Sequence, residues 1–291
     1  MFPGATADPA VADYDVVGAP LDVSTTFQPG TRFGPDRVRT YAETYDDYDR
    51  RTDQSFTELA VADAGDVRAW DDAEAYLSFL AGELSDVSDR GGVPLLLGGE
   101  HTVSYAGVSA TDPDILVCLD AHLDLRSEFD GNEWSHACVT RRALDIVDEA
   151  VVLGARTGSE EEWERADAGD VTVVPPEGVG EWLDGFDGFG GIDADGDGSE
   201  SGSEDAGPDV YLSVDIDGAD PSVAPGTGTM EPFGLSPREM RDVVRAVAPG
   251  CVGFDVVEVN DRDDGQAAAL GGKLLREFVY EHAANRRDAD G

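Results

Sequence analysis

Three of the four histidines in this chain lie in short motifs that also carry polar or acidic side chains: Gly98–His101 (GGEH), Asp120–Asp124 (DAHLD) and Ser135–His136. A further acidic motif is Ser213–Asp217 (SVDID). Mixed carboxylate and imidazole ligands suit Mn²⁺, whereas Mg²⁺ usually keeps more of its water. These motifs therefore predict a site for two divalent ions, with six candidate ligands: His101, Asp120, His122, Asp124, Asp215 and Asp217.

The elements that must position these ligands are predicted from apolar runs. Continuous runs rich in β-branched residues are typical of strands covered on both faces, as in a parallel sheet. They occupy Tyr14–Gly18, Val93–Leu97, Ile115–Leu119, Ala150–Leu153, Val171–Val174, Val210–Val214 and Val252–Val257. Helical spacing occupies Ala73–Leu84, His136–Asp148, Ser236–Val247 and Gln266–His282. This alternation predicts one α/β domain over residues 1–291, with three layers in the order α/β/α.

The candidate ligands follow three of the predicted strands. Because side chains at i, i+2 and i+4 share one face of a strand, we expect Asp120, His122 and Asp124 to project together. We expect Asp215 and Asp217 to do the same, and His101 to follow its strand after two glycines. Ligand sites of open parallel sheets lie at the carboxyl ends of the strands. The three segments are therefore predicted to meet in one crevice.

One stretch departs from this alternation. Residues 185–208 are rich in Gly, Asp, Ser and Glu, which predicts a loosely held acidic surface insertion. Part of it has the spacing of an EF-hand calcium loop, with Asp193, Asp195, Asp197, Gly198 and Glu204 at the key positions. No helical pattern flanks it, and a Gly/Asp tract produces such a match by composition. We therefore expect no calcium site there.

The charge of the chain is extreme, with 62 Asp and Glu against 20 Lys and Arg and a net charge of −42. Such a surface repels nucleic acid and anionic membranes, so neither is an expected partner. It would attract cationic ligands, but its spread along the whole chain favours adaptation to high salt, where charges are screened beyond ~3 Å at 1 M. No apolar run approaches the ~18 residues of a membrane span. With no signal-peptide pattern and no disulfide framework, a cytoplasmic protein is predicted.

Taken together, the motifs resemble those of the ureohydrolase superfamily, which includes arginases and agmatinases, and most of all archaeal-type agmatinases of a halophile. The similar segments run through nearly the whole chain: residues 18–20, 29–39, 98–101, 120–126, 135–142, 213–221, 225–229 and 258–260. The resemblance implies a mostly parallel sheet of about eight strands between helices. It also implies a homo-oligomer, commonly a trimer or hexamer, and two Mn²⁺ per subunit.

The resemblance also implies a role for each site residue. One ion would be held by His101, Asp120, Asp124 and Asp215, and the other by Asp120, His122, Asp215 and Asp217. Asp120 and Asp215 would bridge them, and a metal-bridging hydroxide would attack the guanidinium carbon. Asp124 would orient the hydroxide, Glu258 and Thr229 would contact the guanidinium, and His136 would shuttle a proton. The alternative for His136 is a structural role at a helix start capped by Ser135.

The implied substrate is a small cationic guanidino compound. Residues 125–134 resemble the corresponding agmatinase segment, which favours hydrolysis of agmatine to putrescine and urea. Changes in the motifs at Glu100, residues 230–233 and Asp261 leave other ureohydrolase substrates open: arginine, a guanidino acid, aminopropylagmatine, or formiminoglutamate paired with Arg126 or Arg141. An inactive acidic metal-binding protein is the remaining alternative. It is disfavoured because all six candidate ligands, His136 and Glu258 are present.

Overall fold

The computed structural model describes residues 1–189 and 207–289, which form ten strands and eight α-helices. The strands are β1 (Tyr14–Ala19), β2 (Tyr48–Asp49), β3 (Gln54–Ser55), β4 (Val61–Asp66), β5 (Val93–Gly98), β6 (Ile115–Leu119), β7 (Glu149–Leu153), β8 (Val171–Val174), β9 (Val210–Asp215) and β10 (Cys251–Val257). The helices are α1 (Gly34–Ala42), α2 (Ala73–Ser88), α3 (Ser104–Thr111), α4 (Val139–Ala143), α5 (Glu160–Ala166), α6 (Val179–Gly185), α7 (Pro237–Val247) and α8 (Gln266–Ala289).

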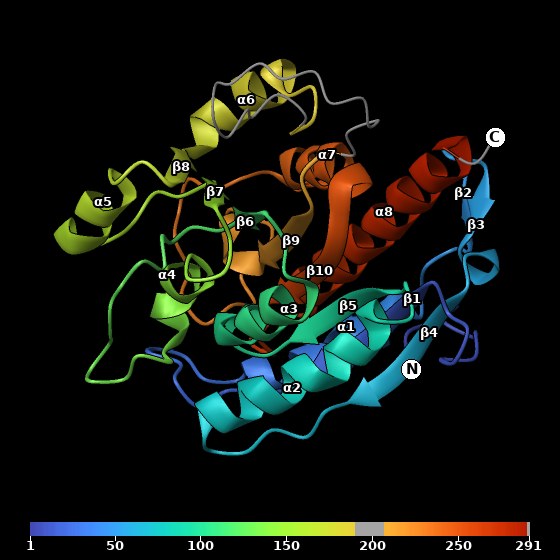
Figure 1. The fold of residues 1–291 in the computed structure, drawn as a ribbon, viewed down its shortest axis with the longest axis horizontal. Coiled ribbons are helices and arrows are strands. Elements are labelled where there is room, and N and C mark those ends of the chain that lie inside the picture. Colours follow the sequence, from blue (N-terminus) through green and yellow to red (C-terminus); the bar gives the residue numbers. More distant parts are fainter. Residues whose placement is uncertain (190–206, 290–291) are drawn as a thin grey trace, which may run out of the picture.

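Eight of the strands form one sheet in the order β4-β1-β5-β10-β9-β6-β7-β8 (Figure 1). Every pairing in this sheet is parallel, whereas β2 and β3 form a separate antiparallel pair. The predicted fold class, an α/β protein with a mostly parallel sheet of about eight strands, is therefore confirmed. Since all the carboxyl ends meet at one edge of the sheet, side chains that follow different strands can reach one another there.

The sheet is covered by helices on both faces. Leu95 and Leu97 of β5 pack with α1, α7 and α8, whereas Leu96 packs with α2 and α3 on the other face. In β6, Val117 and Leu119 likewise face the first layer, and Leu116 and Cys118 face the second. Both alternate sets are buried, which explains why these strands are apolar at every position. The predicted α/β/α layers follow from this arrangement.

All seven predicted strands are present, but several other elements were missed. β4 lies at the edge of the sheet and exposes alternate residues, so its sequence, VADAGD, contains no apolar run. Helices α1, α3, α5 and α6 have at most nine residues each, too few for a clear helical period. The predicted helix over Ser236–Val247 is present as α7, and Ser236 and Glu239 form a reciprocal capping box at its start.

The predicted helix over His136–Asp148 is wrong in length. A 3₁₀ turn at His136–Cys138 leads into α4, which ends at Ala143. The predicted insertion is described only at its edges: α6 reaches Gly185, and residues 190–206, with the EF-hand-like motif, lie outside the described residues. Within residues 1–189 and 207–289, no helix is both long and apolar enough to cross a membrane.

Candidate metal centre

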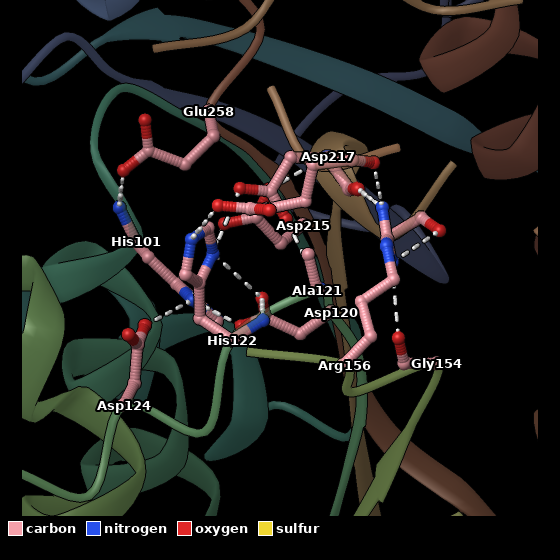
Figure 2. A network of polar contacts seen from close by, with 12 residues as sticks. His101, Asp120, Ala121, His122, Asp124, Gly154, Arg156, Asp215, Asp217 and Glu258 are labelled. Carbon is pink, nitrogen blue, oxygen red and sulfur yellow. Dashed lines mark hydrogen bonds and ion pairs between the residues drawn. The ribbon is translucent and has the colours of Figure 1, made fainter. Parts of the chain in front are cut away.

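The site lies at the carboxyl ends of four neighbouring strands in the middle of the sheet, β5, β10, β9 and β6. His101 follows β5, Glu258 follows β10, Asp215 ends β9, and Asp120 follows β6. Figure 2 shows the side chains of these four segments converging. The predicted meeting of separate motifs in one crevice is thus what the structure contains, with β10 as a fourth contributor.

The first group of ligands surrounds one nitrogen of His101. Its Nδ1 lies 3.0 Å from Asp124 Oδ2 and 3.1 Å from Asp120 Oδ2. It also lies 3.4 Å from Asp215 Oδ2. All four residues are buried. A single ring nitrogen facing three carboxylates is an arrangement that a bound cation would satisfy.

The second group surrounds His122, with Asp120 shared between the two. Nδ1 of His122 lies 3.0 Å from Asp217 Oδ2 and 3.6 Å from Asp120 Oδ1. One ligand atom each from Asp120, His122 and Asp217 lie within 4.8 Å of one another, as do those of His101, Asp120 and Asp124. The six predicted ligands therefore form two adjoining groups, each suited to a metal ion.

The backbone brings these side chains together differently from the prediction. β6 ends at Leu119, and the segment that follows is a turn rather than a continued strand, so the side chains do not alternate as expected. Asp217 lies in a 3₁₀ turn, Ile216–Gly218, after β9. Asp124 has φ 51° and Glu258 has φ 60°. Left-handed backbone is uncommon for residues other than glycine, and the surrounding structure must hold both residues in this conformation.

The carboxylates of the site are buried close to one another, which disfavours their negative charges. Burial, together with Asp217 and Asp120, raises the pKa of Asp215 well above its usual range. Burial and the charge of Asp120 raise the pKa of Asp124 to about 6. Asp120 Oδ2 is buried and has no hydrogen-bond partner among the described residues. Because buried carboxylates cost free energy unless compensated, these residues fit divalent cations.

A polar chain that the sequence analysis missed fixes the orientation of His101. Ser213 Oγ donates to Asp255 Oδ1 at 2.7 Å and lies 3.1 Å from His101 Nε2. Tyr211 also donates to Asp255, and the whole chain is buried. Since the Ser213 proton is committed to Asp255, Nε2–H of His101 donates to Ser213, and Nδ1 keeps its lone pair for a cation. The available signal was Asp255, a charged residue inside an apolar strand.

Glu258 links the first group to His136. Its Oε1 accepts a hydrogen bond from the His101 backbone N–H at 2.9 Å and lies 3.2 Å from His136 Nδ1. Burial opposes protonation of His136, but the hydrogen bond and charge of Glu258 outweigh it and raise the pKa of His136 to about 9. The capping prediction for Ser135 also holds, because its Oγ accepts from Ala137 N–H.

A loop after β1 holds His136 from the other side. The His136 backbone N–H donates to Ser24 Oγ at 2.9 Å, and His136 Nε2 lies 3.2 Å from Thr26 Oγ1. Glu100, fully buried, accepts the backbone N–H groups of Val23 and Ser24. The glutamate beside His101 therefore fixes this loop. Ser24 and Thr26 were not predicted, since no local motif marks them.

A cavity of about 260 Å³ opens over the two ligand groups. The predicted residues His122, Asp124, His136, Asp215, Asp217, Thr229 and Glu258 line it, and its wall also includes Thr26, Arg126, Phe129 and Glu162. His101 and Asp120 lie beneath this surface, almost fully buried. Arg141 is absent from the described lining, so of the two arginines named for an anionic substrate only Arg126 faces the cavity.

Two other side chains have structural roles. His282 lies on α8 and is buried, and its two ring nitrogens form hydrogen bonds with Tyr14 Oη at 2.8 Å and the Cys251 carbonyl at 3.1 Å. Cys138 is also buried, and burial raises the pKa of its thiol to about 11. Neither residue lines the cavity.

Comparison with known proteins identifies the family of this chain. The model of the arginase family matches residues 12–280. The chain belongs to the arginase family. It is 34% identical over 276 residues to the agmatinase of Pyrococcus horikoshii, covering 93% of this chain and 92% of that one. It is 32% identical over 285 residues to the N(1)-aminopropylagmatine ureohydrolase of Thermococcus kodakarensis, covering 92% and 90% of the two chains.

The structural comparison agrees. The crystal structure of the agmatine ureohydrolase of Thermoplasma volcanium superposes with a TM-score of 0.87 and 31% identity, covering 99% of this chain and 95% of that one. The predicted membership of the ureohydrolase superfamily, and with it a hydrolase of guanidino compounds, is confirmed by these arginase-family matches.

Proposed function

We propose that this protein is an agmatinase, which hydrolyses agmatine to putrescine and urea with two Mn²⁺ per chain. The observation that carries the proposal is Glu258, a buried carboxylate beside the metal ligands in the cavity wall. Its Oε1 is occupied by His101 and His136, whereas Oε2 accepts no hydrogen bond from any described residue. A carboxylate oxygen in the cavity wall that has no hydrogen bond from the described residues suits a guanidinium donor.

Two divalent ions, when bound by the His101 and His122 groups, would supply a water of low pKa as the nucleophile. The chain's own residues do the rest. Asp124, at the surface of the cavity, accepts a hydrogen bond from the attacking water and orients it. Glu258 pairs with the guanidinium, and Thr229 adds a polar contact. Holding the reactants in this geometry removes part of the entropic barrier.

His136 completes the reaction as the proton donor. As the carbon–nitrogen bond to the alkyl amine breaks, the leaving nitrogen must gain a proton. His136 lines the cavity, and Glu258 holds its pKa at about 9, so the imidazole carries a proton at neutral pH. Its contacts with Ser24 and Thr26 keep the ring in place between transfers.

The outer wall of the cavity supports agmatine over arginine. Arginine would bring a carboxylate that needs an unpaired cation. Arg126 is the one arginine in the described cavity lining, and Glu162 already pairs with it at 3.3 Å. Its guanidinium also lies 5.4 Å from the centre of the Phe129 ring. A substrate with a second cationic end avoids the cost of a buried unpaired carboxylate.

N(1)-aminopropylagmatine is the second candidate substrate. It is favoured by the 32% identity to the Thermococcus kodakarensis enzyme, which covers nine tenths of both chains. The two candidates share the guanidinium and differ in the cationic tail, which in N(1)-aminopropylagmatine is longer by an aminopropyl group and carries one more amine. Both therefore use the same metal ligands, His136 and Glu258.

The test is urea release from Mn²⁺-loaded protein in multimolar KCl, with agmatine, arginine and N(1)-aminopropylagmatine assayed side by side. Agmatine should give the highest kcat/KM. Urea from arginine but not from agmatine would refute the proposal. A clear preference for the longer substrate would replace agmatine by the second candidate. A metal-loaded protein that hydrolyses none of the three would favour the inactive metal-binding alternative.

Other features remain predictions of the same proposal. Manganese is proposed from the mixed imidazole and carboxylate ligands. Adaptation to high salt is proposed from the net charge of −42. The trimer or hexamer, the cytoplasmic location and the single-domain character of residues 1–291 also stay predictions.

A further inference from the structure

Arg156 lies just beyond the end of β7 and has an unusual set of partners. Its guanidinium donates only to backbone carbonyls: Gly154 at 2.9 Å, Asp217 at 2.8 Å, Gly218 at 3.3 Å, Ala219 at 3.3 Å, Glu231 at 2.6 Å and Pro232 at 3.1 Å. In a chain with 62 acidic residues, it forms no ion pair with any described carboxylate. Figure 2 shows it beside Asp217.

These carbonyls belong to three separate segments: the end of β7, the turn at residues 217–219, and the loop at residues 231–232. Asp217, in the turn, is a candidate ligand of the second metal group. Arginine has five N–H donors fixed in one plane, so it can hold all three segments in one geometry, which lysine cannot. Gly234 leaves room for this, because a Cβ there would lie 2.6 Å from Arg156 Nη2.

The loop at residues 231–234 is held from its other side by Asp220. Asp220 Oδ2 accepts the backbone N–H of Phe233 at 2.8 Å and of Gly234 at 3.2 Å. Hydrogen bonds from Ser222, Gly234 and Phe233 lower the pKa of Asp220 to about 2. Phe233, 87% exposed, has φ 69°, which is costly for a bulky residue. The loop therefore keeps a strained shape between two polar anchors.

The result of this double anchoring is the position of Glu231. Its Oε1 lies 4.0 Å from His122 Nε2, while Nδ1 of the same ring lies 3.0 Å from Asp217 Oδ2. At 4.0 Å the two atoms are at ion-pair distance and do not form a hydrogen bond, so the negative charge of Glu231 acts on the ring through space and makes it a stronger ligand. Arg156 thus holds Asp217 directly through its backbone and His122 indirectly through Glu231.

We propose that Arg156 is a positioning residue for the second metal position, the one formed by His122 and Asp217. It forms no hydrogen bond or ion pair with His101 or Asp124, the ligands specific to the first position. Replacing Arg156 should therefore weaken binding of the ion at the second position and leave binding at the first position unchanged. This inference rests on the proposed two-metal function, but not on which guanidino compound is the substrate.

The experiment is a Mn²⁺ titration of metal-free protein in multimolar KCl, with bound metal measured by elemental analysis and by electron paramagnetic resonance. The variants are Arg156→Gln, Arg156→Lys and Glu231→Gln. Arg245→Gln is the matched control, because Arg245 pairs with Glu277 at 2.7 Å between α7 and α8. Circular dichroism and melting temperature check that each protein is folded.

We expect wild type and the control to bind two ions and give the signal of a coupled pair. Arg156→Gln should bind the first ion normally and the second about 10–100-fold more weakly, giving the signal of an isolated ion. The affinity of Arg156→Lys for the second ion should lie between that of wild type and that of Arg156→Gln. Glu231→Gln leaves the arginine in place and should weaken binding of the same ion. This variant therefore tests the inference even if the Arg156 variants do not fold.

Two results would overturn the inference: an unchanged second affinity in the Arg156 and Glu231 variants, or equal weakening of both ions. A wild-type protein that binds only one ion would overturn the two-metal proposal and this inference together. Two ions without agmatine hydrolysis would overturn the substrate alone and leave the role of Arg156 standing.

Discussion

Removing the metal should make the stability of this protein fall with rising pH, because protons then take the place of the ions. Without metal, His101 keeps a proton among the carboxylates of Asp120 and Asp124, and its pKa is raised despite burial. The pKa of His122 is raised in the same way, against burial, mainly by Asp217. That of His136 is raised to about 9 by Glu258. Once metal is bound, the lone pairs of His101 and His122 are no longer open to protons.

The direction of this change in stability follows from the linkage between proton binding and folding. A histidine whose folded pKa is raised contributes stability that is complete below its unfolded pKa, about 6.5, and is lost as the pH rises toward the folded value. For His136 the interval from 6.5 to about 9 corresponds to about 3 kcal/mol at ~1.4 kcal/mol per pH unit. With His101 and His122 of the same sign, the free energy of unfolding should fall by up to about 4 kcal/mol per pH unit above pH 6.5.

Three other groups change protonation outside this set of histidines, and their effects on stability differ in sign. Burial and Asp120 raise the pKa of Asp124 to about 6, so its contribution is lost as the pH rises toward that value. Burial lowers the pKa of His282 to about 4, so its contribution is gained between about 4 and 6.5. Burial, Asp217 and Asp120 also raise the pKa of Asp215, so its contribution is likewise lost as the pH rises. The decline should therefore be steepest above pH 6.5, where the three histidines act together.

The assay is urea unfolding of metal-free protein followed by circular dichroism, from pH 6 to pH 9 in multimolar KCl, which screens the general repulsion of the surface. His136→Gln should remove about a third of the decline. His282→Gln is the matched control, since that histidine is neutral in both states above pH 6.5 and its loss should leave the slope unchanged. A stability that stays level or rises above pH 6.5, or a His136→Gln slope equal to that of wild type, would refute the argument.

Two further predictions concern the substrate and the surface. Glu258→Gln keeps an acceptor for His101 N–H but removes the charge proposed to pair with the guanidinium. We expect kcat/KM to fall by about 10–150-fold, which corresponds to the ~1.5–3 kcal/mol of a charged hydrogen bond, while the amount of bound Mn²⁺ stays unchanged. Full activity in this variant would contradict the pairing. Dilution from multimolar KCl into a low-salt buffer should lower the melting temperature, because the charge of −42 is then unscreened, and a melting temperature independent of salt would contradict adaptation to high salt.

The sequence predicted the layers of the fold because burial on both faces leaves a strong local pattern. β6, for example, is apolar at all five positions and was located to the residue. β4, at the edge of the sheet, is half-exposed, and its alternating polar residues conceal it. Short helices such as α4 were misjudged for a related reason: five residues do not complete two turns, so tertiary contacts rather than periodicity decide where they end.

The six candidate ligands were predictable because each lies in a motif whose residue types are unusual beside an apolar strand. The residues that hold them were not, because they act through the backbone or from distant segments. Arg156 bonds carbonyls that any residue could supply, and Ser24 reaches His136 across 112 positions of the chain. Asp255 was visible as a buried charge, but its link to His101 requires Ser213 on the neighbouring strand β9. None of these contacts has a spacing that a motif could express.

The order of the strands in the sheet brings these motifs together into one site. The chain visits β5, β6, β9 and β10 in sequence, whereas in the sheet they stand as β5-β10-β9-β6. Placing β10 between β5 and β9 lets Glu258 contact the backbone of His101 at 2.9 Å and brings Asp255 within 2.7 Å of Ser213. If the neighbours followed chain order, Glu258 would lie at the end of the row, with two strands between it and the strand that precedes His101. Local sequence patterns predict that the carboxyl ends share an edge, but the crossover that inserts β10 is set by packing on both faces of the sheet.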